Sequence, residues 1–79
     1  MSGNAKTRRA NTMKLVHGVM SVGEKTKARI IMDRLIDTYG PSHHYLPRST
    51  NALAAILRGE HTMTQVTEHN RRYSWRRNQ

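Results

Sequence analysis

The strongest pattern in the chain is a stripe of apolar residues between residues 28 and 39. The stripe recurs at intervals of three and four residues and comprises Ala28, Ile31, Met32, Leu35, Ile36 and Tyr39, which is one face of an amphipathic helix. Ser21 and Glu24 precede it in the Ser-x-x-Glu spacing of a capping box. Gly40 and Pro41 follow it as end signals, because glycine accepts left-handed dihedrals and proline does not continue a helix. The pattern predicts a helix over about residues 22–39.

A second helix is predicted over residues 51–58. A connector with prolines at both ends, residues 41–48, separates it from the first helix, and Tyr45 and Leu46 are the expected core anchors of this connector. The cap of the second helix is one of three adjacent polar residues, Ser49, Thr50 or Asn51. Its buried face has three apolar residues at helical spacing, Leu53, Ile56 and Leu57. Gly59 is the expected end of this helix.

The last third of the chain changes to a two-residue period, which is typical of β-strands. Apolar and polar residues alternate before and after residues 68–71, where Asn70 tolerates the positive φ of a turn. Pairing Val66 with Tyr73 predicts a hairpin. Its inner face then carries four residues, Thr64, Val66, Tyr73 and Trp75. Trp75 is expected to lie over the first helix as a core residue, and the arginines to project from the other face and the tip.

The N-terminal residues carry no clear period. Residues 1–12 are small, polar and basic, which predicts a disordered arm. Residues 13–20 are apolar but short, and they could form a strand, a helical turn or a segment that orders only on binding. They are also the candidate contact of a homodimer, because they are apolar and otherwise unassigned. The chain is expected to form a single α+β domain over residues 13–79, with helices followed by a C-terminal β-hairpin.

Charge points to a class of ligand. Fourteen Lys and Arg oppose five Asp and Glu among 79 residues, which gives a net charge of +9. Residues 1–20 hold four of the bases and no acid, residues 61–79 hold four bases and one acid, and the centre is nearly balanced. Such a field attracts polyanions, of which nucleic acid is the commonest in a cell.

The order of these elements resembles the winged helix-turn-helix family of DNA-binding domains. The resemblance rests on KARIIMDRLIDTYG as a first helix, STNALAAILRG as a helix-turn-helix element and QVTEHNRRYSWRR as the wing. A full member has two helices after the first. Either residues 41–45 supply a short second helix and residues 51–58 the recognition helix, or residues 51–58 are the second helix and residues 60–65 the third. The first arrangement is preferred, because residues 61–64 have poor helix propensity.

The resemblance implies that one helix enters the major groove while the wing contacts the backbone or the minor groove. Four residues near the start of the second predicted helix could then reach base edges, namely Arg48, Ser49, Thr50 and Asn51, and Arg58 lies at its other end. The hairpin would supply Asn70, Arg71, Arg72, Arg76 and Arg77 as contacts to phosphate. The N-terminal arm would add Lys6, Arg8 and Arg9.

Other chemistry finds little support in the sequence. There is no cysteine, and the five histidines lack the spacing and the acidic neighbours of a metal site, so no metal or cofactor is expected. No nucleophile–base arrangement or glycine-rich phosphate loop is present, so the protein is not expected to be an enzyme.

The apolar runs are far shorter than the roughly 20 residues of a membrane helix. No signal-peptide core follows the basic N-terminus. A cytoplasmic, nucleoid-associated location is expected, or a nuclear one in a eukaryote.

These features together predict a small transcription regulator that binds double-stranded DNA, alone or as a homodimer. Two alternatives stay open. The first is an RNA-binding or ribosome-associated protein, since such proteins also combine small cores with cationic tails. The second is an adaptor or inhibitor that grips an acidic protein, which a fold alone does not exclude.

Overall fold

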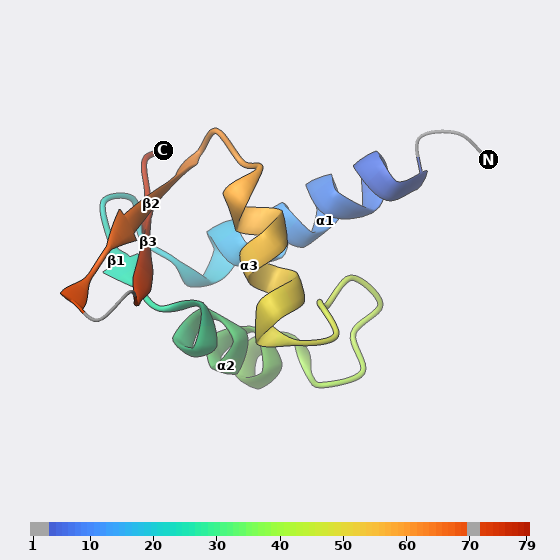
Figure 1. Ribbon diagram of the computed structural model, residues 1–79. Coiled ribbons are helices and arrows are strands. Elements are labelled where there is room, and N and C mark those ends of the chain that lie inside the picture. The colour runs from blue at the N-terminus through green and yellow to red at the C-terminus, as the bar shows by residue number, and fades with distance from the viewer. Residues whose placement is uncertain (1–3, 70–71) are drawn as a thin grey trace.

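The computed structural model describes residues 4–69 and 72–79 of the chain, with side chains from Thr7 onward. Three helices and three strands follow one another along the described part of the chain: α1 (Asn4–Val19), β1 (Lys25–Thr26), α2 (Ala28–Tyr39), α3 (Thr50–Arg58), β2 (Met63–Thr67) and β3 (Tyr73–Arg77). All strand pairs are antiparallel, and β3 lies between β1 and β2. Figure 1 shows α3 crossing in front of α1, with α2 below and the sheet at one side. The α+β fold with helices before a C-terminal hairpin is confirmed.

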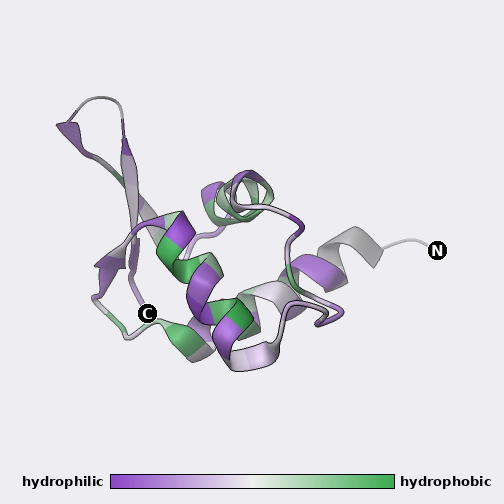
Figure 2. Ribbon diagram, turned by 90° about the horizontal axis from the view of Figure 1, so that it is seen from below, coloured by the Kyte–Doolittle hydropathy of each residue, from purple (hydrophilic) through white to green (hydrophobic). Residues whose placement is uncertain are grey.

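One hydrophobic core holds the helices and the sheet together. Its buried residues come from every helix, from the connector and from the strands: Met13, Val16, Met20, Ile31, Met32, Leu35, Leu46, Leu53, Leu57, Met63 and Trp75. Leu46 anchors the connector as predicted, and Trp75 is only 2% exposed. Figure 2 shows how apolar and polar residues alternate along α2, as they do in an amphipathic helix.

The first helix, α1, is the largest difference from the sequence prediction. The arm expected to be disordered over residues 1–12 needs correction, because residues 7–12 are helical and Thr12 is buried. The expected domain boundary at residue 13 therefore falls inside a helix. Residues 13–20 form the second half of α1 and the turn after it, and Met13, Val16 and Met20 lie in the core of the monomer. These side chains are consequently not available for the dimer contact that the sequence suggested.

Gly18 explains why α1 can pack so closely on α2. A Cβ atom at this position would overlap the hydroxyl oxygen of Tyr39. The residue interrupts the apolar run in the sequence, yet in the structure it is a contact point between two helices. A glycine that looks like a break in the sequence pattern thus leaves room for the Tyr39 hydroxyl where α1 packs on α2.

The helix predicted over residues 22–39 begins later than expected, at Ala28. The backbone N–H of Ser21 does donate to a carboxylate oxygen of Glu24 at 3.0 Å, but this contact closes a turn. The chain then runs extended as β1, in which Lys25 pairs with Arg76 and Thr26 with Trp75. The end of the helix was predicted well, since Gly40 has a φ of 88° and donates its N–H to Ile36.

The helix count removes the choice that the sequence left open. With α1 as the first helix, α2 and α3 are the two that follow. Residues 41–45 form turns and no helix, and residues 60–65 lead into β2, so neither of the arrangements considered for a missing helix is correct. Ser49 is the cap of α3, because its Oγ accepts the N–H of Ala52 at 3.1 Å. Leu53 and Leu57 form the buried face as predicted, with Ile56 half-buried beside them.

The hairpin is present, but its register differs by one residue from the predicted one. Val66 pairs with Ser74, and Tyr73 pairs with Thr67. A slip of one residue moves every side chain of a strand to the opposite face relative to its partner. Trp75 keeps its core position, but it shares a face with Gln65 and not with Val66. Tyr73 is 46% exposed and not part of the core.

Candidate nucleic-acid interface

The exposed face of α3 carries short side chains flanked by basic ones. Asn51, Ala55 and Arg58 are exposed and follow the i, i+4, i+7 spacing of one helix face, while Leu53 and Leu57 hold the opposite face in the core. Arg48 is exposed just before the helix begins. We refer to Arg48, Asn51, Ala55 and Arg58 as the α3 surface. Its short side chains at the centre allow another molecule to approach the helix closely, between guanidinium groups at both ends.

Two of the predicted base-reading residues have structural duties. Ser49 caps α3, and Thr50 is half-buried. Arg48, Ser49 and Asn51 are all exposed, but the Ser49 hydroxyl is engaged as the cap, so Arg48 and Asn51 are the predicted contacts at the start of α3 that are exposed and have no part in the cap. The local sequence therefore identified the correct segment, while the cap geometry decides which of its side chains are free.

Basic residues of α1 lie beside α3. The Arg8 guanidinium donates to the carbonyl of His44 at 3.4 Å. The Arg9 guanidinium reaches the end of α3, 3.9 Å from the position that a Cβ of Gly59 would occupy. A cation at this end is favoured by the helix dipole. The side chain of Lys6 lies outside the described part of the structure.

The hairpin carries two exposed arginines, Arg72 and Arg76. It projects from the body of the domain in Figure 2. Exposed Tyr73, the first residue of β3, follows Arg72 directly in the chain, and sequence alternation missed it as a surface residue because the inferred register placed it inside. Asn70 and Arg71, two of the predicted phosphate contacts, lie outside the described residues.

Arg77, predicted as a phosphate contact, is bonded within the fold. Its Nη1 donates to the carbonyls of His17 and Met20 at 3.0 and 2.6 Å, and its Nε donates to the carbonyl of Gln79 at 2.7 Å. The guanidinium thus binds the carbonyl-rich end of α1, where a cation is favoured. His17 also contacts the Thr62 hydroxyl through Nε2 at 3.1 Å. Burial, with the nearby charge of Arg77, lowers the pKa of the His17 ring.

Replacing Arg77 with alanine is therefore expected to destabilise the fold. Loss of charged hydrogen bonds to backbone carbonyls lowers the free energy of unfolding by about 2 kcal/mol. Urea denaturation followed by the fluorescence of Trp75, the single tryptophan, measures this. Arg76→Ala is the matched control, because the neighbouring arginine is exposed and should leave stability nearly unchanged. Equal stability of the two variants would contradict the structural role of Arg77.

Two carboxylates of the described residues bind basic side chains away from the α3 surface. Lys25 binds Glu68 at 2.9 Å and Arg34 binds Glu24 at 2.6 Å. The pKa of Glu68 is lowered mainly by the hydrogen bond from Lys25, and that of Glu24 mainly by the backbone N–H of Ser21 and then by Arg34. In this part of the chain, eight arginines have no Asp or Glu carboxylate within 4.0 Å: Arg8, Arg9, Arg29, Arg48, Arg58, Arg72, Arg76 and Arg77.

Comparison of the chain with protein families, with curated proteins and with solved structures gives no match. Over residues 4–69 and 72–79, no helix is both long and apolar enough to cross a membrane. Within the same ranges, no three His, Asp or Glu side chains come together in the way that a metal ion requires.

Proposed function

We propose that the protein binds double-stranded DNA as a small transcription regulator, with α3 in the major groove and the β2–β3 hairpin on the sugar–phosphate backbone. The α3 surface carries this proposal. It presents an amide and short side chains between two arginines that have no carboxylate partner among the described residues. A surface of this kind attracts a polyanion and lets the helix approach it closely.

The chemistry of the α3 surface suits base edges. A major groove about 12 Å wide admits an α-helix. Asn can pair with adenine, Arg with guanine, and an alanine methyl can contact the methyl group of thymine. Asn51, Ala55 and Arg58 would present these three kinds of contact on successive turns of one face.

The arrangement of elements also supports a winged-helix mode of binding. Two helices follow the first, and a hairpin with exposed arginines ends the domain. One feature differs from a simple helix-turn-helix, in which a turn of three or four residues joins the helices. The connection between α2 and α3 covers residues 40–49. The orientation of α3 is therefore set by Leu53 and Leu57 in the core and by Leu46 in the connector, and not by a tight turn.

Fluorescence anisotropy with duplex DNA and structured RNA of equal length, each at two salt concentrations, tests the proposal. We expect tighter binding to the duplex, with sequence preference retained at the higher salt. Tighter binding to RNA would replace this proposal with a role in RNA binding. Absence of binding to both would indicate that the basic surface serves an acidic protein partner.

The hairpin is expected to act through charge and not through base recognition. Replacing Arg72 and Arg76 with alanine should weaken binding to all duplex sequences equally, because phosphate contacts carry no sequence information. The slope of log K against log salt should become shallower by about 2, one for each lost contact. Arg29→Ala, at an exposed position near the start of α2, is the control. An unchanged slope in the double variant would remove the hairpin from the interface.

A further inference from the structure

A groove lies beside α3, on the side that faces α1. It has a volume of about 370 Å³ and is formed by the first half of α1, the end of the connector and the first two turns of α3. Its apolar lining comes from Leu46, Pro47, Ala52 and Ile56. A volume of this size lies at the lower end of the range of roughly 300–1,000 Å³ that small-ligand sites occupy.

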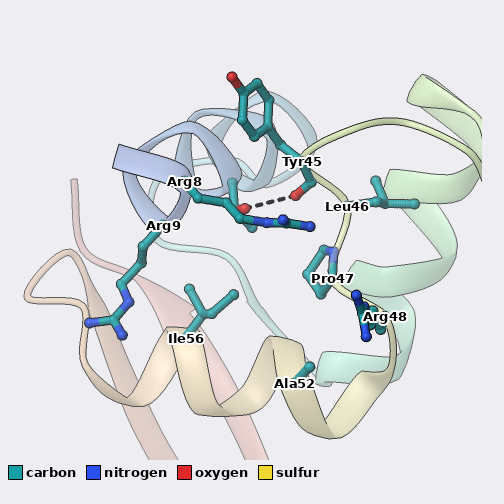
Figure 3. Close-up of a pocket in the computed structure, with 9 residues that line it drawn as sticks. Arg8, Arg9, Tyr45, Leu46, Pro47, Arg48, Ala52 and Ile56 are labelled. Atoms are coloured by element: carbon teal, nitrogen blue, oxygen red, sulfur yellow. Dashed lines mark hydrogen bonds between the residues drawn. The ribbon is translucent and has the colours of Figure 1, made fainter. Parts of the chain in front are cut away.

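Hydrogen bonds between distant parts of the chain build this groove. The hydroxyl of Thr12, which is buried in α1, donates to the carbonyl of Tyr45 at 2.7 Å and holds the connector against the helix. Arg8 adds its bond to the His44 carbonyl. Figure 3 shows the Thr12–Tyr45 bond at one wall of the groove, with Ala52 and Ile56 on the opposite wall. The groove is thus a defined feature of the fold.

Three arginines surround this apolar lining. Arg8 and Arg9 come from α1 and Arg48 from the connector, and none has a carboxylate partner within 4.0 Å among the described residues. Among the residues that the structure describes, no acidic side chain lines the groove. Guanidinium groups that line a groove without a nearby carboxylate attract an anion, and their flat faces also stack on aromatic rings.

A ligand that matches both the apolar lining of the groove and its arginines is anionic at one end and flat and apolar at the other. A phosphate backbone in a regular duplex uses the charges but leaves the apolar lining without a partner. An unpaired nucleotide uses both, because its base can stack on side chains while its phosphate binds arginine. We propose that the groove accepts an unpaired nucleotide, with the base against Ala52, Ile56 and Pro47 and the phosphate on Arg8 and Arg48. Because α3 forms one wall, this inference rests on the proposed function and adds to it a preference for duplexes that carry an unpaired nucleotide.

The test compares one duplex in two forms, blunt and with a three-nucleotide single-stranded end. We expect the form with the single-stranded end to bind about tenfold more tightly, the effect of stacking one base. Excess AMP shows whether the groove binds a free nucleotide or only a nucleotide that is part of a DNA strand. If a free nucleotide occupies the same groove, AMP removes the advantage of the single-stranded end. If the groove requires a nucleotide within a strand, the advantage persists.

Two matched variants test whether the tighter binding of the form with a single-stranded end comes from the groove. Ala52→Glu places a carboxylate in the groove, and it should preserve the start of α3, because glutamate three residues after Ser49 completes a capping box. Ala55→Glu places the same charge on the α3 surface. We expect Ala52→Glu to bind both DNA forms with equal affinity. Ala55→Glu should weaken both while keeping the tenfold ratio.

Equal affinity of the wild-type protein for the two forms, together with no AMP-induced shift of the Ile56 methyl resonances, would overturn the groove proposal and leave duplex binding intact. If neither DNA form binds, the proposed function fails, and the AMP titration alone decides on the groove. A shift of the Ile56 methyls in wild type that Ala52→Glu abolishes would then support it, and no shift would overturn it.

Discussion

Reversing the charge of Arg48 and Arg58 is expected to abolish binding to duplex DNA. Arg48 precedes α3 and Arg58 ends it, so the double variant Arg48→Glu/Arg58→Glu places repulsive charges at both ends of the α3 surface. An arginine that contacts a base or a phosphate contributes about 1–3 kcal/mol, and reversal adds repulsion to the lost contact. We therefore expect affinity to fall by roughly 1,000-fold for the pair. Anisotropy titration at low salt measures the loss.

The control for this variant must carry the same change in net charge. Lys14 on α1 and Arg29 on α2 are exposed and lie on neither α3 nor the hairpin. Lys14→Glu/Arg29→Glu lowers the net charge by the same four units. Since charges in solvent are screened beyond a Debye length of about 8–10 Å, we expect only a severalfold loss of affinity from this pair. Similar losses in both double variants would mean that total charge, and not the α3 surface, determines binding.

The substitution Leu53→Ala is expected to cause the largest loss of stability. Leu53 is 0% exposed at the centre of α3, in a core shared with α1, α2 and the sheet. Removing a buried leucine side chain costs about 3 kcal/mol from lost transfer energy and the cavity left behind. A domain of this length has a total stability of about 4–12 kcal/mol, so much of it would be lost. We expect a fall in melting temperature of about 15 °C, measured through Trp75 fluorescence.

A substitution at the surface provides the reference for this measurement. Ile30 lies on α2 and is 45% exposed, so Ile30→Ala removes a side chain of the same size that is only partly buried. Its cost should be below about 1 kcal/mol. If the two variants melted at the same temperature, Leu53 would not be a core residue and the placement of α3 would have to be revised.

Sequence patterns that involve residues a few positions apart predicted the local structure well. The apolar stripes of α2 and α3, the cap at Ser49, the end at Gly40 and the buried position of Trp75 all follow from side chains within a few residues of one another. The exposed residues Arg48, Asn51 and Arg58 were placed at the ends and on the outer face of α3 by the same reasoning. Whether they bind nucleic acid stays a prediction.

Three structural features were not predicted from local sequence patterns, because contacts between residues distant in the sequence determine them. The first half of α1 is polar along the sequence, yet it is helical in the structure, with Thr12 bound to the connector. The start of α2 moved to Ala28 because residues 25–26 pair with β3. The hairpin register is settled by the position of β3 between two strands and by the contact of Trp75 with the core.

The sequence by itself determined α2, α3 and the β2–β3 hairpin, the α+β class and the basic character of the surface, since these depend on period, caps and composition. Only the tertiary structure decided which arginines are free. Arg77 binds the end of α1, while Arg8, Arg9 and Arg48 line one groove. The physical reason is that a helix or a turn is specified by residues a few positions apart. Arg8 and Arg48 are forty residues apart in the sequence. They line the same groove only because the core brings α1 and the connector together.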